Sequence, residues 1–355
     1  MCYPLFRYCI SSKRRCRCCF LLYLFLYLPV LKSSPEVLLH NADHAIADDC
    51  VVIFVTLLEL LGYGAGGIFR ALLVTLFSAA ACVFFEWAYA KLTKTPCKIY
   101  DLSAIVTGVL LAFVCPVAIP YWCILIGDFF AMIVVKAIFG GIGRNIVNPA
   151  LAGRAFMFSY PALMTVWVKP GFQNWTGIFS AVVTDANSCA TPLSSMKSGM
   201  LPEATVSELF LGNIGGCIGE TSVLLLLIGL VYLLVRKVIT LRIPLAFIGT
   251  VAVLTFLFPQ GNPNFRWMAA QLFSGGLFLG AIFMATDYVT SPLTRMGQIV
   301  FGIGCGVLTV VIRYFGGYPE GVSYAILIMN CCVVLLDRIG RPTKFGAPKK
   351  EVAKK

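Results

Sequence analysis

Residues 102–139 read LSAIVTGVLLAFVCPVAIPYWCILIGDFFAMIVVKAIF, two apolar runs separated by a segment that contains Pro116 and Pro120. Each run is close to the roughly 20 apolar residues that a helix needs to cross a bilayer. The charged side chains within this stretch are Asp128 and Lys136. The pattern therefore predicts two membrane-spanning segments, with a broken helix or a hairpin at the prolines.

The whole chain shares this apolar character. It has 355 residues, of which 59% are hydrophobic and 12% are charged. Soluble globular proteins average about 45–50% apolar and about 25% charged residues, so this composition excludes a soluble fold. We predict an all-α polytopic membrane protein with about ten transmembrane helices. The expected spans are residues 45–63, 70–90, 102–119, 121–139, 147–167, 221–235, 243–258, 268–286, 297–313 and 321–337.

The two halves of the chain follow a similar order of features. Ser103 and Ser274 each open an apolar run that meets proline and later reaches a Gly-Gly pair. Five expected spans precede the long loop 168–220 and five follow it. Because an odd number of spans reverses the orientation, the halves are expected to form a five-plus-five inverted repeat. Such repeats place broken helices around a central site near the membrane midplane.

The charge pattern gives an orientation. The net charge of +12 would suggest nucleic acid in a soluble protein, but basic residues of membrane proteins gather in cytoplasmic loops. Most lysines and arginines fall on one side if both termini are cytoplasmic, so no nucleic-acid partner is expected. The expected parts are an N-terminal extension, either peripheral or spurious (1–32), a first membrane half (33–167), an outward-facing loop (168–220), a second membrane half (221–337) and a basic cytoplasmic tail (338–355).

The long loop contains the sequence DANSCATPL at residues 185–193. Long loops in compact proteins are often functional. The segment can also be an ordinary helix start, in which Thr191 is the N-cap and Pro192 is the first helical residue. From the spacing alone, these two interpretations remain open.

The spacing Asp-x-x-Ser-x-Ala-Thr resembles the site at which flavin transferases esterify the phosphate of FMN to a threonine hydroxyl. In this chain Asp185, Ser188, Ala190 and Thr191 match that motif, whereas Cys189 stands where the family form has glycine. The resemblance implies covalent FMN on Thr191 and a flavin transferase that matures the protein. A non-redox scaffold remains an alternative if Cys189 prevents the attachment.

Nearly the whole chain from Ser33 resembles the D subunit of the Rnf ion-translocating ferredoxin:NAD oxidoreductase complex. The resemblance rests on that start and on FGGIGRNIVNPALAGRAF (139–156), MATDYVTSPLT (284–294) and GGYPEGVSYAILIMN (316–330). The B subunit of the sodium-translocating NADH:quinone reductase is similar, and a component of that kind is an alternative.

The family resemblance implies a function in an assembly. Electrons would pass between ferredoxin and NAD through covalent FMN and a second flavin, riboflavin, coupled to export of Na+ or H+. The expected partners are the other Rnf-type subunits, including iron–sulfur and second flavoprotein subunits, and membrane lipid. The expected location is the bacterial cytoplasmic (inner) membrane. The chain would be part of a translocase with no catalysis of its own, and no catalytic residue or metal-ligand set is predicted.

Other residues are candidates for binding. Arg154 lies after a Gly-Gly pair at the end opposite Thr191 and could hold the flavin ribityl chain or a carboxylate, or extend to the cytoplasmic edge. Gly316 and Gly317 are expected on the same face as Thr191, where positive φ would let the backbone approach a ligand, or where they form a simple turn. Asp128 is a candidate for the ion path, because acids at membrane depth are often functional. Pairing of Asp128 with a serine or with backbone is the alternative.

A competing function is a channel or carrier for a small neutral solute. An inverted repeat supports that fold as well as it supports a redox protein. A covalently bound flavin would distinguish the two.

Overall fold

The computed structural model describes residues 64–95, 102–141, 143–168, 191–261 and 263–338, with side chains from Phe69 onward. These residues form α-helices and two short π-helices, and the described part contains no strand beyond one isolated bridge between Pro116 and Cys217. The expected helical class is therefore confirmed.

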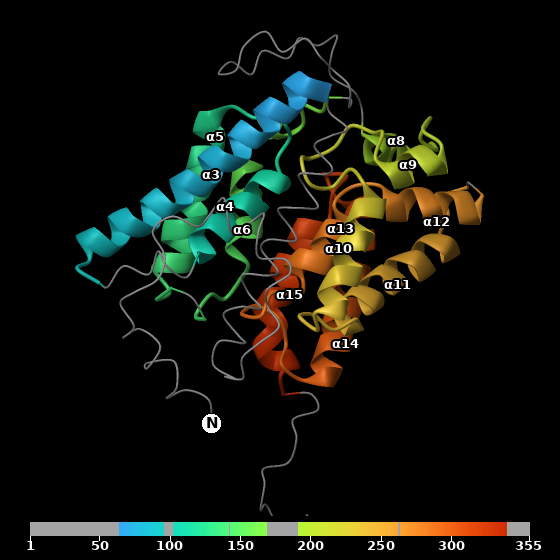
Figure 1. The fold of residues 1–355 in the computed structure, drawn as a ribbon. Helices are drawn as coiled ribbons and strands as arrows, with labels where there is room; N and C mark the ends of the chain where they lie inside the picture. Colours follow the sequence, from blue (N-terminus) through green and yellow to red (C-terminus); the bar gives the residue numbers. More distant parts are fainter. Residues whose placement is uncertain (1–63, 96–101, 142, 169–190, 262, 339–355) are drawn as a thin grey trace, which may run out of the picture.

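The first half is a bundle of helices around α4. Its elements are α3 (Gly64–Leu92), α4 (Ser103–Phe113), α5 (Tyr121–Phe129) continuing into η5 (Phe130–Ala137), α6 (Pro149–Met157) and α7 (Pro161–Met164). α3 packs on α4 and α5, and α6 packs on α5 and η5 (Figure 1).

The chain leaves the helix between α4 and α5, where residues 114–120 include two prolines. Such a break exposes backbone groups that need other partners. The side chain of Arg70 supplies two of them by donating to the carbonyls of Val117 and Ile119, at 2.9 and 3.2 Å. The backbone N–H of Ile218 donates to the carbonyl of Cys115. The break is thus held by a residue of α3 and by the end of the long loop.

The second half contains α10 (Val223–Val235), α11 (Arg242–Leu257), α12 (Asn264–Phe273), α13 (Leu277–Leu279) continuing into η7 (Gly280–Met284), α14 (Arg295–Phe315) and α15 (Val322–Leu336). Two short helices, α8 (Pro192–Lys197) and α9 (Val206–Leu211), precede it and lie beside α12 (Figure 1). α14 packs between α11 and α15.

The two halves share one buried core. Leu111 and Leu151 from the first half and Phe247 and Phe301 from the second belong to the same cluster of buried apolar side chains. α6 packs against α15, and the Asn148 amide donates to the backbone carbonyl of Met284 at 3.4 Å. These contacts place residues of α6 near the second half.

Two described helices, Phe69–Leu92 within α3 and Arg295–Phe315, are long and apolar enough to cross a membrane. A third span results if the pair Asn264–Phe273 and Leu277–Met284, bent by 63°, is counted as one. Four more apolar helices are shorter: Ser103–Phe113, Val223–Val235, Arg242–Leu257 and Val322–Leu336. The structure thus supports a helical membrane protein, and the number ten stays a prediction. The expected span 45–63 lies outside the described residues, as do the extension 1–32 and the tail from residue 339.

Candidate functional site

Thr191 begins α8 as its N-cap. Its Oγ1 accepts a hydrogen bond from the backbone N–H of Ser194 at 3.3 Å, and Pro192 is the first helical residue. The helix-start interpretation is therefore confirmed, and it is compatible with a modified hydroxyl because capping uses only a lone pair of the oxygen. The side chain is 8% exposed.

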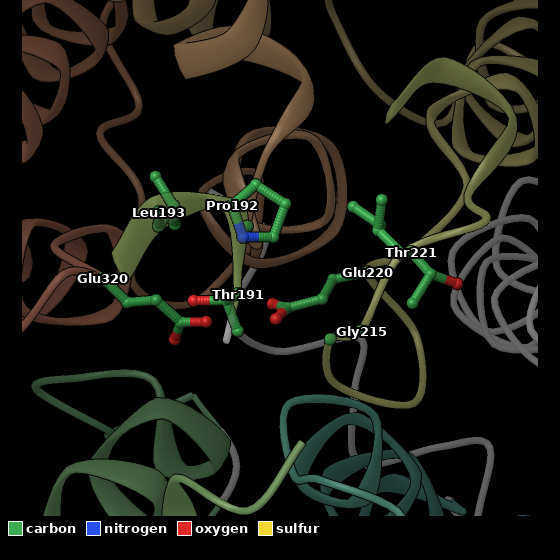
Figure 2. A pocket seen from close by; sticks show the side chains of 10 residues that line it. Thr191, Pro192, Leu193, Gly215, Glu220, Thr221 and Glu320 are labelled. Atoms are coloured by element: carbon green, nitrogen blue, oxygen red, sulfur yellow. The ribbon is translucent and has the colours of Figure 1, made fainter. Parts of the chain in front are cut away.

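Thr191 lines a small cavity formed by four segments of the chain (Figure 2). The lining residues are Thr191, Pro192, Leu193, Ile214, Gly215, Gly216, Glu220, Thr221, Gly275 and Glu320. In Figure 2 the threonine side chain lies between the carboxyl groups of Glu220 and Glu320. The segment before α10 and the turn between α14 and α15 thus bring two acids to the candidate attachment residue.

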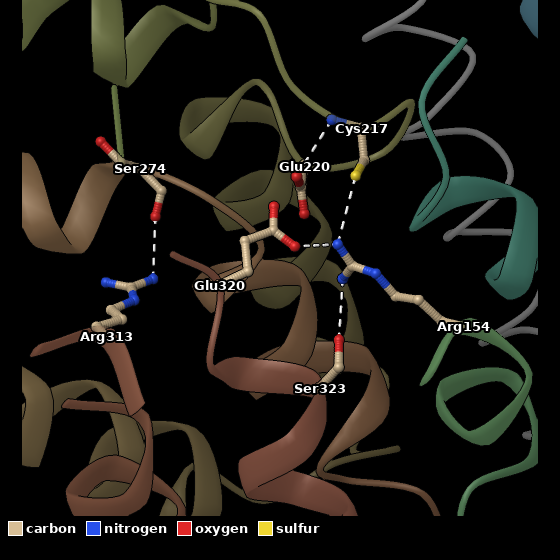
Figure 3. Close-up of polar contacts among 7 residues, drawn as sticks. All are labelled: Arg154, Cys217, Glu220, Ser274, Arg313, Glu320 and Ser323. Carbon is tan, nitrogen blue, oxygen red and sulfur yellow. Dashed lines mark hydrogen bonds and ion pairs between the residues drawn. The ribbon is translucent and has the colours of Figure 1, made fainter. Parts of the chain in front are cut away.

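Arg154 reaches this site from α6. Its Nη2 forms an ion pair with Glu320 and contacts Cys217 Sγ at 3.6 Å, while Nη1 donates to Ser323 Oγ at 2.9 Å (Figure 3). The Arg154 side chain is 3% exposed and that of Glu320 is 12% exposed. Arg154 therefore does not lie at the opposite end and does not extend to the cytoplasmic edge. Burial in the middle of α6 points it toward the second half, where it holds a protein carboxylate.

Glu220 lies in the non-helical segment between α9 and α10. Its Oε1 accepts a hydrogen bond from the backbone N–H of Cys217 at 3.1 Å. Burial, and next the neighbouring Glu320 carboxylate, raise the pKa of Glu220 above its usual range. The group therefore holds a proton more readily than an exposed glutamate.

A break between α12 and α13 forms another wall. Gly275 has φ +70°, and a Cβ there would lie 2.4 Å from Leu193 Cδ1. A Cβ on Gly276 would lie 2.5 Å from Glu220 Oε2. Arg313 at the end of α14 holds the break by donating to the carbonyls of Gln271 and Ser274, at 2.6 and 3.2 Å. Positive φ favours glycine at position 275, and a side chain at either position would require Leu193 or Glu220 to move.

The cluster of Cys217, Glu220 and Glu320 has the composition of a metal site. One ligand atom from each lies within 4.8 Å of the others. However, the Arg154 guanidinium contacts both Cys217 and Glu320 (Figure 3). Positive charge is thus already present between them, so we do not assign a metal to this cluster.

The remaining residues of the flavinylation motif, Asp185, Ser188 and Ala190, lie outside the described residues, as does Cys189.

The expectation of positive φ at the second Gly-Gly pair is wrong. Gly316 ends α14 with φ −74°, and Gly317 also does not adopt positive φ. Gly316 is needed for space instead, because a Cβ there would lie 2.4 Å from the carbonyl oxygen of Ile312. The carbonyl of Gly317 accepts a hydrogen bond from Lys197, which ties this turn to α8.

Asp128 lies in α5, away from the cavity, and is fully buried. Its Oδ1 accepts hydrogen bonds from Ser78 Oγ at 2.7 Å and from Cys82 Sγ at 3.3 Å. Its Oδ2 has no hydrogen-bond partner among the described residues. The pairing with serine is thus observed, and it leaves half of the carboxylate unsatisfied.

Sequence reasoning missed Glu220, Glu320, Cys217 and Arg313 as site residues. Glu220 and Glu320 each lie within three residues of the start of an apolar helix, and an acid beside such a helix is a candidate for a functional residue. Nothing in local sequence indicates that both face Thr191, because the contact depends on how the loop packs on the second half.

The helical, membrane-type fold and the buried polar cluster between two halves define a polytopic membrane protein with an internal site. The chain belongs to the NQR2, RnfD, RnfE family, whose model matches residues 32–346. It is 40% identical over 322 residues to the D subunit of the Na(+)-translocating ferredoxin:NAD(+) oxidoreductase complex of Acetobacterium woodii, covering 90% of this chain and 96% of that protein.

Two further relatives have similar names. The D subunit of the proton-translocating ferredoxin:NAD(+) oxidoreductase complex of Clostridium ljungdahlii is 40% identical over 336 residues, covering 89% of this chain and 96% of that protein. The D subunit of the ion-translocating oxidoreductase complex of Stutzerimonas stutzeri is 38% identical over 298 residues, covering 77% and 83%. The resemblance to the RnfD family that the motifs carry is thereby confirmed.

Proposed function

We propose that this chain is the RnfD-type membrane flavoprotein of an ion-translocating ferredoxin:NAD oxidoreductase, with FMN esterified to Thr191. The observation that supports it is the position of Thr191 in a chain of this family. Thr191 completes the flavinylation motif and lines a cavity between the loop and the second half. As one component of an assembly it would act in a translocase and not catalyse a reaction alone.

The described residues fit the attachment of FMN through its phosphate. Thr191 offers a hydroxyl oxygen at the start of α8, and the guanidinium of Arg154 is close to the same cavity. Bound FMN would supply the electron-transfer chemistry, while the protein supplies position and exclusion of water. The cavity is too small for a flavin ring, so it would hold the phosphate end of FMN and not the ring.

The five-plus-five inverted repeat is part of this proposal, and one repeated contact supports it. In the first half, Lys136 Nζ donates to Ser103 Oγ at 2.7 Å. In the second half, Arg313 donates to the carbonyl of Ser274. The two serines are those that open the matched apolar runs, and each basic residue lies within about one helical turn of a Gly-Gly pair.

The coupling ion would pass near Asp128. A carboxylate oxygen that is buried without a partner at membrane depth requires compensation by a proton or a cation. The chain would work in the bacterial cytoplasmic membrane with iron–sulfur and flavoprotein partners, and riboflavin would be the second flavin. A flavin transferase would modify Thr191.

The test is flavin fluorescence in a denaturing gel of protein co-expressed with a flavin transferase. We expect a fluorescent band from the wild type and none from Thr191→Ala. Thr205→Ala is a matched control, because Thr205 is also a helix N-cap, at α9, but outside the cavity. A colourless wild-type protein would contradict the proposal and favour the solute channel.

A further inference from the structure

One oxygen of Glu220 is buried without a hydrogen-bond partner. The residue is 3% exposed, and Oε2 has no partner among the described residues. The carboxyl group lines the cavity and points toward Thr191 (Figure 2). Because an ionised oxygen without a partner is costly to bury, this atom is expected to bind something.

Glu320 faces the same space. Ligand oxygens of the two carboxyl groups lie within 4.8 Å of each other (Figure 3). Arg154 forms an ion pair with Glu320 and therefore compensates one of the two negative charges. Two carboxyl groups this close repel each other when both are ionised, which favours a proton on one of them.

Several titratable or charged groups act on Glu220 from the elements around it. They are Cys217 on its own segment, Glu320 on the turn after α14, Arg154 on α6, Arg313 on α14 and Cys115 after α4. The guanidinium of Arg313 donates to backbone carbonyls of the α12–α13 break. With both carboxyl groups ionised, two guanidinium groups and two carboxylates are neutral together, so a negative charge added at Thr191 is compensated only when one of the acids takes up a proton.

We propose that Glu220 and Glu320 form a proton-binding site, in which Glu220 Oε2–H donates to Glu320, and that this proton offsets the negative charge of a phosphoester on Thr191. The second part rests on the proposed function, whereas the first does not. The buried environment and the neighbouring Glu320 carboxylate both favour the protonated form of Glu220, as the upward direction of its pKa indicates. Esterification adds negative charge beside the pair, so it should tighten proton binding.

The experiment is infrared difference spectroscopy of the full-length protein during a pH titration, which detects the C=O stretch of a protonated carboxyl group. The spectra of flavinylated wild type and of Thr191→Ala are compared, with ¹³C-labelled glutamate to identify glutamate bands. We expect a glutamate band that is absent in Glu220→Gln and present in Glu203→Gln, whose side chain lies outside the cavity. Its midpoint should lie about one pH unit higher in the flavinylated protein than in Thr191→Ala.

The possible outcomes separate the two parts. A band that persists unchanged in Glu220→Gln overturns the proton-binding site. Equal midpoints, with FMN on Thr191 shown by mass spectrometry, overturn the charge compensation alone. The absence of FMN together with a Glu220-dependent band contradicts the proposed function and supports the proton-binding site. If Glu220→Gln does not fold, Glu320→Gln replaces it: removing the acceptor should move the midpoint, and an unchanged midpoint overturns the pair.

Discussion

Arg154 and Glu320 meet across 166 residues of sequence and join the two halves of the molecule. Sequence reasoning identified Arg154 as a functional candidate because a charge within an apolar helix needs a partner. It could not identify that partner, since several acids lie near helix ends and hydropathy carries no information on which ends meet. The same limit hid the approach of Glu220 to Thr191.

Arg154→Gln should destabilise the protein by about 3–5 kcal/mol, because it leaves Glu320 buried without its cation. Thermal unfolding in detergent measures the effect. Arg144→Gln is the control, since Arg144 is exposed. The double variant Arg154→Gln/Glu320→Gln should regain part of the stability. Equal unfolding midpoints for Arg154→Gln and the wild type would refute this role of the ion pair.

Asp128→Asn tests the proposed ion path. Asparagine keeps the acceptor oxygen that Ser78 and Cys82 contact and removes the charge. We expect ion transport by the assembled complex to fall at least about tenfold, because a neutral amide does not compensate a passing cation or carry a proton. Flavin content should stay at the wild-type value. The measurement is ion uptake into vesicles together with in-gel fluorescence, and unchanged transport would show that the acid is structural.

At the scale of elements, the two breaks differ in how well the sequence predicted them. The break before α5 was predicted from Pro116 and Pro120, because proline lacks a backbone N–H donor and clashes with the preceding helical turn. The break between α12 and α13 lies within the expected span 268–286 and was not predicted. Its signal is Gly275, which adopts positive φ beside Leu193, and glycine is too common in membrane helices to mark a break by itself.

Gly275→Ala should perturb α8 and thereby the position of Thr191. The new Cβ would overlap Leu193, and positive φ costs a non-glycine residue about 1–2 kcal/mol. We expect a lower unfolding midpoint and less flavin per protein. Gly317→Ala is the matched control, since a Cβ at Gly317 would have no neighbouring atom within 4 Å. If both variants retain wild-type flavin content, the break does not position the attachment residue.

At the scale of the molecule, apolar run length predicted the helical class and placed helices within the expected ranges that the structure describes. For example, 121–139 corresponds to α5 and η5, which run from Tyr121 to Ala137. The family was predicted correctly from separated sequence motifs, because a motif is recognised from local sequence alone. The π-helical geometry of η5 did not follow, because an apolar run looks the same whether it forms an α- or a π-helix.

The predicted orientation places the C-terminus in the cytoplasm and the loop 168–220 outside. A fluorescent protein fused after Lys355 should therefore fluoresce, and alkaline phosphatase inserted in the loop should be active. The physical reason is the retention of lysine and arginine on the cytoplasmic side. Paired alkaline phosphatase and fluorescent-protein fusions measure it. An external C-terminus would contradict the five spans expected after the loop.

The attachment of FMN to Thr191 is the central claim, and mass spectrometry of the peptide spanning Asp185 to Lys197 tests it most directly. The protein is purified from membranes of cells that contain a flavin transferase. We predict a peptide heavier by one esterified FMN, with fragment ions that place the added mass on Thr191 and not on Ser194 or Ser195. An unmodified peptide from such cells, or FMN on another residue, would contradict the account.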